Sequence, residues 1–269
     1  MFSDSDDFVN RFMAHFGMEH CYVCEINGEI AAMAFMLPTS LSYNVQKFKD
    51  LKIQKIKNIS LKSQISNLKS LHYVYACATR PQYRRQGIMA KLLETIYEEA
   101  CRENAAGIFL RAANHNLENY YRSLGFEDFF YRNSVFFKHS ARGDHKEGTE
   151  IQLITPKVYY EKRLQRLEGF CFVNWGEGFF NFLYETGMQF FEYENAIFSL
   201  RIENETIIVD ELLGNPPKEE IASLIFNYFS DYKTVKIYYP EQISCCGQVK
   251  WCKFFNENPE KGYFAFAME

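Results

Sequence analysis

The segment LHYVYACATRPQYRRQGIMAKLLETIYEEACRENAAGIFLRAANHNLENYYRSLGF, residues 71–126, decides the fold of this chain. Residues 71–79 are apolar and aromatic, which is typical of a strand that is buried on both faces. A turn leads from them into residues 87–104, whose apolar side chains recur at helical spacing. Residues 106–113 are expected to form the next strand and residues 116–124 the next helix. This order of elements predicts an α/β fold with neighbouring parallel strands.

The turn before the first of these helices has the features of an anion-binding site. Gly87 lies at the expected helix start, and Arg84 and Arg85 precede it. The first N–H groups of a helix have no partner inside it and carry roughly half a positive charge, so a glycine turn there can bind a pyrophosphate through its backbone. The arginines add positive charge. We therefore expect residues 84–89 to bind a diphosphate group.

Two short motifs in this segment resemble a known family. Residues 84–89, RRQGIM, are similar to the R/Q-x-x-G-x-G/A coenzyme A loop of the GNAT superfamily of N-acetyltransferases. Met89 departs from that pattern and implies either a more open turn or a side chain that points away from it. Residues 121–126, YRSLGF, resemble the Y-x-x-x-G-F that ends the fourth GNAT helix. The resemblance implies a GNAT fold over residues 20–138, an α/β (α+β) fold with a mixed central sheet flanked by helices.

Composition limits the classes of protein that this chain can belong to. Its 269 residues suit two domains of about 120–140 residues each. A net charge of −4 gives no general basic field, so we expect no nucleic-acid partner. The acidic N-terminus lacks the features of a signal peptide, and the longest apolar run, residues 30–37, is far shorter than the ~20 residues that span a bilayer. We expect a soluble, cytoplasmic protein with no membrane partner.

The eight cysteines are expected to be free thiols and to hold no metal. A chain without a leader stays in a reducing cytosol, where disulfides are rare. Cys21 and Cys24 have C-x-x-C spacing but lie in an alternating segment before Asn27-Gly28, which is a hairpin signal. Residues three apart on a strand point to opposite faces, so this pair is not expected to share a metal. The cysteines at residues 245–252 provide no second C-x-x-C pair.

Residues 1–140 form the expected first domain. Besides the segment above, its expected elements are a helix at about 4–16, hairpin strands at 20–27 and 29–37, and closing strands at 127–138. The opening GNAT strand is missing, so either another segment fills that edge or the given chain starts downstream of it. Residues 40–70 are rich in lysine. This insertion is either a basic lid or docking surface or, as we favour, a solvated loop.

Residues 150–269 are expected to form a degenerate second GNAT-like domain after a polar linker at 139–149. The order of elements partly repeats, with helices near 156–168 and 177–186, a hairpin across 203–205, a strand at 206–213, a helix at 216–230 and a strand at 233–239. Its turn, Asn215-Pro216-Pro217-Lys218, stands where the first domain has residues 84–87, and prolines offer no N–H to a phosphate. We therefore expect coenzyme A to bind only the first domain.

This tandem arrangement resembles the enhanced-intracellular-survival group of acetyltransferases. Members of that group carry a further sterol-carrier-like domain, for which this chain is too short. The C-terminal carboxylate that acts in their active site belongs to that third domain, so we do not transfer its role to Glu269.

The resemblance implies an N-acetyltransferase that transfers an acetyl group from acetyl-CoA, without a metal, to a primary amine. The resemblance implies that Tyr121 is the general acid, since its distance to Gly125-Phe126 fits the family. A phenol with a pKa of about 10 is protonated at neutral pH and can protonate a leaving thiolate. Tyr120 is its competitor, since residues adjacent on a helix face about 100° apart and only one of the two can point at the thioester. The resemblance implies coenzyme A contacts from Cys77, Ala78, Thr79, Arg84, Arg85, Gln86, Gly87, Ile88, Met89 and Asn114.

Several roles stay open at this point. Asn114 suits either a cofactor contact or a helix N-cap. His115 is expected to be a surface residue of the same turn. The general base is open between Glu127, Asp128, Tyr73, Tyr75 and a water chain. The acceptor can be a small-molecule amine, a peptide N-terminus or a lysine side chain. A catalytically silent acetyl-CoA sensor and a module that docks an acidic partner are the alternatives to an enzyme.

Overall fold

The computed structural model describes residues 5–44, 66–139, 151–257 and 259–266. The helices in this part of the chain are α1 (Asp6–Phe16), α2 (Ile88–Arg102), α3 (His115–Ser123), α4 (Pro156–Arg166), α5 (Glu177–Glu185) and α6 (Lys218–Tyr228). The strands are β1 (Cys21–Ile26), β2 (Glu29–Asn44), β3 (Ser66–Thr79), β4 (Gly107–Leu110), β5 (Glu127–Lys138), β6 (Gln152–Ile154), β7 (Phe172–Asn174), β8 (Gln189–Tyr193), β9 (Ala196–Glu203), β10 (Thr206–Leu213), β11 (Thr234–Trp251) and β12 (Gly262–Tyr263). The expected mixed α/β fold is confirmed.

The strands form one 12-stranded sheet in the order β4-β3-β2-β7-β12-β5-β11-β10-β9-β8-β6, with β1 beside β2. Strand β11 also pairs with β4, so the path from β4 to β11 returns to its start and forms a closed circuit. Aromatic rings from this circuit meet in one core: the ring of Tyr73 lies 5.3 Å from that of Trp175, and that of Phe109 lies 5.2 Å from that of Phe264. Both halves of the sequence therefore contribute to a single core.

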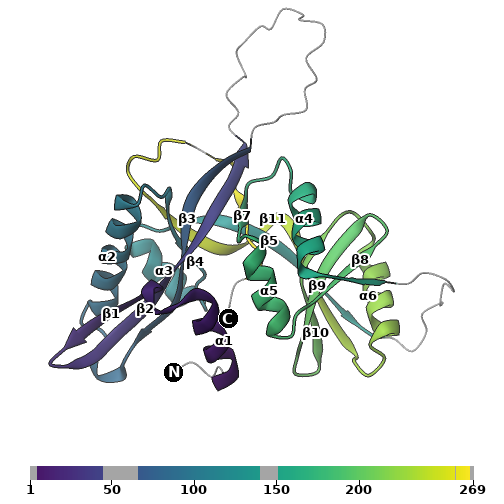
Figure 1. The fold of residues 1–269 in the computed structure, drawn as a ribbon, viewed down its shortest axis with the longest axis horizontal. Helices are drawn as coiled ribbons and strands as arrows, with labels where there is room; N and C mark the ends of the chain where they lie inside the picture. Colours follow the sequence, from purple (N-terminus) through teal and green to yellow (C-terminus); the bar gives the residue numbers. More distant parts are fainter. Residues whose placement is uncertain (1–4, 45–65, 140–150, 258, 267–269) are drawn as a thin grey trace, which may run out of the picture.

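Strands β5 and β11 each run through both halves of the molecule (Figure 1). In the last part of β11, residues 248–251 pair with β4 on one side, and residues 244–249 pair with the first half of β5, residues 127–132, on the other. The other end of β11, residues 234–239, pairs with the second half of β5 and with β10. The division into domains 1–140 and 150–269 remains a proposal, and we amend it, because residues 244–251 complete the sheet of the first half.

Three expectations about the strands are corrected. Residues 127–138 form one strand rather than several, and their partner comes from the end of the chain. The strand expected at 233–239 continues to Trp251. Strands β2 and β3 are longer than the strands expected at 29–37 and 71–79, because they pair with each other from Ala32 opposite Thr79 to Asn44 opposite Ser66. The outer edge of β1 has no neighbouring strand among the described residues, so none of them replaces the missing opening strand.

Capping residues explain where several helices begin. The Ser5 hydroxyl accepts a hydrogen bond from the backbone N–H of Phe8 at 3.2 Å, and the first turn of α1 is acidic. The hydroxyl of Thr155 accepts from Val158 in the same way, with Pro156 at the first helical position of α4. None of the helices in the described ranges has the length and apolar character needed to cross a bilayer.

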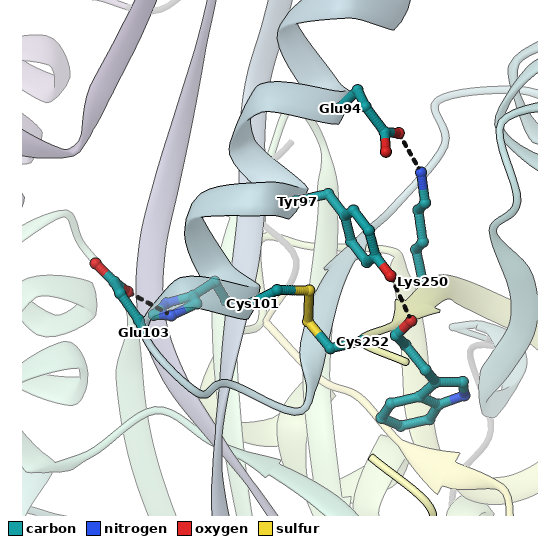
Figure 2. Close-up of a disulfide and its surroundings, with 8 residues drawn as sticks. Glu94, Tyr97, Cys101, Glu103, Lys250 and Cys252 are labelled. Carbon is teal, nitrogen blue, oxygen red and sulfur yellow. Dashed lines mark hydrogen bonds and ion pairs between the residues drawn. A yellow bond between two sulfur atoms is a disulfide. The ribbon is translucent and has the colours of Figure 1, made fainter. Parts of the chain in front are cut away.

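A disulfide joins Cys101, at the end of α2, to Cys252, just after β11 (Figure 2). The expectation that all cysteines are free thiols is therefore wrong for this pair, which the crossing of β11 brings together over a sequence separation of 151 residues. Nearby, the Tyr97 hydroxyl donates to the carbonyl of Trp251 at 3.1 Å, and Lys250 pairs with Glu94 at 2.5 Å. These contacts fasten the end of β11 to α2.

The remaining cysteines agree with the sequence analysis where the structure describes them. Cys21 packs against one core cluster and Cys24 against another, as expected for residues on opposite faces of a strand. Among the described residues there is no group of metal-binding side chains. Most of the lysine-rich insertion and nearly all of the polar linker lie outside the described residues.

Candidate active site

Strands β3 and β4 separate at the position that the sequence assigns to coenzyme A. They pair in parallel only at His72–Ile108 and Tyr73–Phe109. Beyond this point β3 contains an irregularity at Ala76, whose φ is 54° although it is not glycine. The backbone of residues 77–79 is therefore not paired with β4, and a gap opens between the ends of the two strands.

A cavity of about 1100 Å³ lies at this opening. Its walls come from the end of β3, from the turn before α2, from the first turn of α2 and from α3. The residues that line it are Cys77, Ala78, Thr79, Tyr83, Arg84, Arg85, Gly87, Ile88, Met89, Ala90, Asn114, Asn116, Leu117, Tyr120 and Tyr121. Of the residues proposed from sequence as site residues, all but Gln86 line this one cavity.

The turn before α2 has the geometry of an anion cradle. Gly87 adopts the left-handed conformation at φ 74° and caps α2 without a side-chain hydrogen bond. No atom lies within 4 Å of the position that a Cβ would occupy there, so the space beside the turn is open. Arg84 is held by its Nε, which donates to the Thr79 carbonyl at 3.1 Å. The Gln86 side chain instead donates to the carbonyl of Gln82 at 3.0 Å.

Met89 lines the cavity and also packs against the core cluster between α2 and the sheet. Its side chain thus has an apolar environment next to the turn. The sequence analysis gave two explanations for this departure from the family pattern: a more open turn, or a side chain that points away from the turn. The described contacts favour the second, because the Met89 side chain is directed partly into the core.

Asn114 caps helix α3, because its side-chain oxygen accepts from the backbone N–H of Leu117 at 3.1 Å. The capping role is confirmed, and the residue also lines the cavity, so a cofactor contact stays a prediction. His115 is exposed and lies 3.0 Å from Glu118, which confirms its expected surface position.

Tyr121 is buried beside the cavity, with its side chain next to Cys77. Burial raises the pKa of the phenol, and the neighbouring Cys77 raises it further. Burial also raises the pKa of the Cys77 thiol, to about 12. Tyr120 lines the same cavity but is only half-buried. The angle between neighbours on a helix therefore does not separate the two tyrosines, whereas the depth of burial does.

The candidate bases lie away from the described lining of this cavity. Glu127 accepts a hydrogen bond from the Trp251 indole at 2.7 Å. Asp128 accepts from Arg122 at 2.8 Å and from Gln248 at 2.9 Å. Burial raises the pKa of Tyr73, which keeps its phenol protonated. No carboxylate or imidazole belongs to the lining that the structure describes, so a water chain remains the open choice.

A second cavity, of about 240 Å³, shares Asn114 with the first. Arg111, which follows β4, and Arg132 of β5 line it together with residues 244–248 of β11. Burial lowers the pKa of Arg111, and so does the positive charge of Arg132. The sequence analysis missed this cavity, since it forms only where β5 and β11 cross, and no local pattern signals that pairing.

The strand order, the parted strands and the cavity at the start of α2 define a GNAT-type acyltransferase fold. Comparison with known proteins agrees: residues 2–126 match the acetyltransferase (GNAT) family. The likeness to the GNAT acetyltransferase family therefore covers the N-terminal part of the chain. No curated protein sequence matches the chain.

Solved structures extend the likeness of fold beyond that domain. A GCN5-related N-acetyltransferase from Kribbella flavida has a TM-score of 0.64 at 14% identity, over 93% of this chain and 63% of that protein. Eis1 from Mycobacterium abscessus has a TM-score of 0.53 at 12% identity, over 90% and 65% of the two chains. A putative acetyltransferase from Pyrococcus horikoshii has a TM-score of 0.56 at 15% identity, over 100% and 88%. This chain spans less than two thirds of the length of the first two proteins.

Proposed function

We propose that this protein is an N-acetyltransferase that transfers an acetyl group from acetyl-CoA to a primary amine. One observation carries the proposal. Site residues expected from three separate stretches of sequence, 77–79, 84–89 and 114–121, line a single cavity at the start of α2. The match of residues 2–126 to the GNAT family supports acyl transfer in general.

The residues present fit coenzyme A. The open left-handed turn at Gly87 and the start of α2 offer backbone N–H groups to a pyrophosphate, and Arg84 and Arg85 stand beside them. At residues 77–79 the edge of β3 that faces away from β2 has no strand partner, and its backbone groups can hydrogen-bond the amide groups of the pantetheine arm. Bound there, the cosubstrate supplies an activated acetyl group. The apolar walls, including Ile88 and Leu117, exclude water from the pantetheine.

Residues of the chain then position the reactants and supply a proton. Thr79, Gly87 and their neighbours fix the position of the reacting carbonyl, which lowers the entropic cost of the amine's attack. Tyr121 holds a proton at its phenol oxygen, and burial keeps that proton in place until a stronger acceptor forms. Water accepts the proton of the attacking amine, since the described lining holds no carboxylate or imidazole.

A catalytically silent acetyl-CoA sensor is the second candidate. The lack of a carboxylate or imidazole in the described lining favours it, because most positioned bases are of these types. In either case the acceptor amine, whether a small molecule, a peptide N-terminus or a lysine, is unassigned. We also propose a cytoplasmic location; the free thiols of Cys77 and Cys171 agree with it, whereas the Cys101–Cys252 disulfide is of a kind that is rare there.

The test is coenzyme A binding by calorimetry together with thiol release from acetyl-CoA across a panel of amines. In the enzyme, Tyr121→Phe should keep coenzyme A affinity and lower turnover by about 10²–10⁴-fold, the usual contribution of a positioned proton donor. Tyr120→Phe is the matched control and should cost far less. Binding without turnover on any amine would support the sensor. If both variants keep full turnover, the assignment of Tyr121 is wrong.

A further inference from the structure

The second cavity opens where β11 leaves its pairing with β5. Along these strands Asn133 lies opposite Tyr239, but the preceding residue, Arg132, lies opposite Ser244. Residues 240–243 therefore bulge out of the sheet between the two pairs. Residues on both sides of this bulge line the cavity, together with α3 and the residues that follow β4. Its volume of about 240 Å³ suits a small molecule, since a water molecule in the liquid takes about 30 Å³.

Two arginines from different elements bring positive charge to this cavity. Arg111 follows β4 and Arg132 lies on β5, and both line the cavity. Arg132 is only 6% exposed, and the central carbon of its guanidinium lies 3.7 Å from the centre of the Tyr238 ring, which lines the same cavity. This contact holds the guanidinium at the cavity wall. Burial lowers the pKa of Arg111, and the positive charge of Arg132 lowers it further, so each charge disfavours the other.

The negative charges near the two arginines have cationic partners elsewhere. Glu118 of α3 contributes the carboxylate of the described lining, and its Oε2 lies 3.5 Å from Nη2 of Arg122, which is outside that lining. Asp210 shares a different cavity with Arg132 and pairs with Arg201 at 3.0 Å. Positive charge therefore predominates along the described lining of the second cavity. An anion that binds there is attracted by both arginines.

Helix α3 places this cavity next to the one proposed for acetyl-CoA. Asn114, the N-cap of α3, lines both cavities. One helical turn further on, Glu118 lines the second cavity, whereas Leu117 and Tyr121 line the first. A molecule bound by the two arginines therefore lies beside the first cavity, at the boundary that Asn114 forms.

We propose that the second cavity binds a carboxylate of the acceptor, and that the acceptor is a small amine with an acidic group, such as an amino acid. The inference rests on the proposed function, because only an acetyltransferase has an acceptor. A planar guanidinium offers its N–H donors as a fork that matches the two oxygens of a carboxylate. A single negative charge also suits a lining that includes Glu118 better than the double charge of a phosphate does.

The bound carboxylate is not altered by the reaction. The new bond joins the amine nitrogen to the acetyl carbon, while the carbon–sulfur bond breaks and its electron pair stays on sulfur. The amine proton leaves to water, and Tyr121 supplies the proton that the sulfur takes up. The role of the arginines is therefore to select and orient the acceptor, which lowers the entropic cost of the amine's attack.

The first test measures binding without acetyl-CoA, so it does not depend on activity. Calorimetry compares the N-acetyl derivative of each standard amino acid with its amide, which has nearly the same shape but no negative charge. At least one acid should bind about 10- to 100-fold more tightly than its amide, the usual contribution of a hydrogen bond to a charged group. If no acid binds more tightly than its amide, the proposal is wrong. Tighter binding of inorganic phosphate than of any acid would also overturn it.

Substitutions then test whether the arginines cause this preference. Arg111→Gln and Arg132→Gln should each remove most of the difference between acid and amide. Arg102→Gln, at an exposed arginine that pairs with Glu99 at the end of α2, is the matched control and should keep the difference. Arg111→Lys keeps the charge without the fork and should have an intermediate effect, which covers the case that a glutamine variant fails to fold. An unchanged preference in folded Arg111 and Arg132 variants would contradict the proposal.

The last test uses turnover to separate this inference from the proposed function. Thiol release from acetyl-CoA is followed with each free amino acid and with its amide as acceptor. The acid should have a kcat/KM about 10- to 100-fold higher, and Arg111→Gln should raise KM for the acid but not for the amide. Equal kcat/KM for acids and amides would leave the proposed function standing and overturn this inference. Selective binding of acids without turnover on any amine would contradict the proposed function and still support the carboxylate site.

Discussion

The two halves of this protein each place a turn before a helix that follows a central strand, and the two turns differ in what they can bind. Before α2, Gly87 adopts a left-handed conformation with open space beside it. Before α6, Pro217 caps the helix, and the preceding residue is also proline. Prolines have no N–H to offer. The turn before α2 can thus offer backbone N–H groups to an anion, as the proposed function requires, whereas the two prolines before α6 have none to offer.

Removing the second half is expected to have the largest effect. A chain that ends near residue 145 lacks residues 244–251, the part of β11 that lies between β4 and β5. Val249 in this part of β11 is fully buried. The exposed edges of β4 and β5 should make the truncated chain aggregate. Circular dichroism and size-exclusion chromatography check this. A monomeric truncated chain that binds coenzyme A would show that the first half is independent.

Gly87→Glu should abolish coenzyme A binding, with a loss of about 10³-fold or more. The substitution strains the left-handed turn by about 1–2 kcal/mol and places a negative charge where the pyrophosphate should lie. Gly87→Ala carries the strain without the charge and should cost about 10-fold. Calorimetry measures both affinities. Two equivalent binding sites per chain, or undiminished affinity in Gly87→Glu, would contradict the difference between the turns.

The halves also differ in the charges that they bury. Arg163 of α4 and Glu211 of β10 form a fully buried ion pair at 2.8 Å, and the Tyr159 hydroxyl donates to the same carboxylate at 2.7 Å. Arg163→Met should leave that carboxylate buried without its partner and lower the free energy of unfolding by about 3–5 kcal/mol. Urea denaturation measures the loss. Adding Glu211→Leu should restore most of the stability, and a double variant as unstable as the single one would contradict this explanation.

A smaller effect is expected where the disulfide joins the halves. Cys252→Ser should lower the free energy of unfolding by about 2–4 kcal/mol under oxidising conditions, because the open chain gains conformational freedom when unfolded. In the presence of a reductant the parent and the variant should have the same stability. Cys171→Ser, at a buried free thiol in the second half, is the control for loss of a cysteine side chain.

The smallest effect concerns pH and the partly exposed ion pair of the first half. Burial alone would raise the pKa of Asp128, but hydrogen bonds from Arg122 and Gln248 outweigh burial and lower it. A lowered pKa stabilises the fold above the ordinary Asp pKa of about 3.9, and this stabilisation disappears as the pH falls below that value. Asp128→Asn should therefore cost about 1 kcal/mol at pH 7 and progressively less as the pH falls from about 3.9 through the lowered pKa, as followed by thermal unfolding.

The sequence predicted the local parts of this structure well and the long-range pairings poorly. Residues 84–89, 114 and 121 could be placed because helix starts and helical spacing are properties of neighbouring residues. Nothing near residue 245 indicates that it pairs with residue 131, since pairing between distant strands depends on the whole sheet. The disulfide and the second cavity follow from such pairings, and the irregularity at Ala76 is a feature that no alternation pattern reveals.

The crossing of β5 and β11 has a consequence for protein synthesis. A ribosome makes the chain from its N-terminus, and β4 and β5 leave it long before residues 244–251 exist to fill the gap between them. At about 5–20 residues per second, the wait is of the order of ten seconds. During that time the nascent first half has an incomplete sheet with two open strand edges. Chaperones that bind exposed strands should therefore engage this protein while it is being translated.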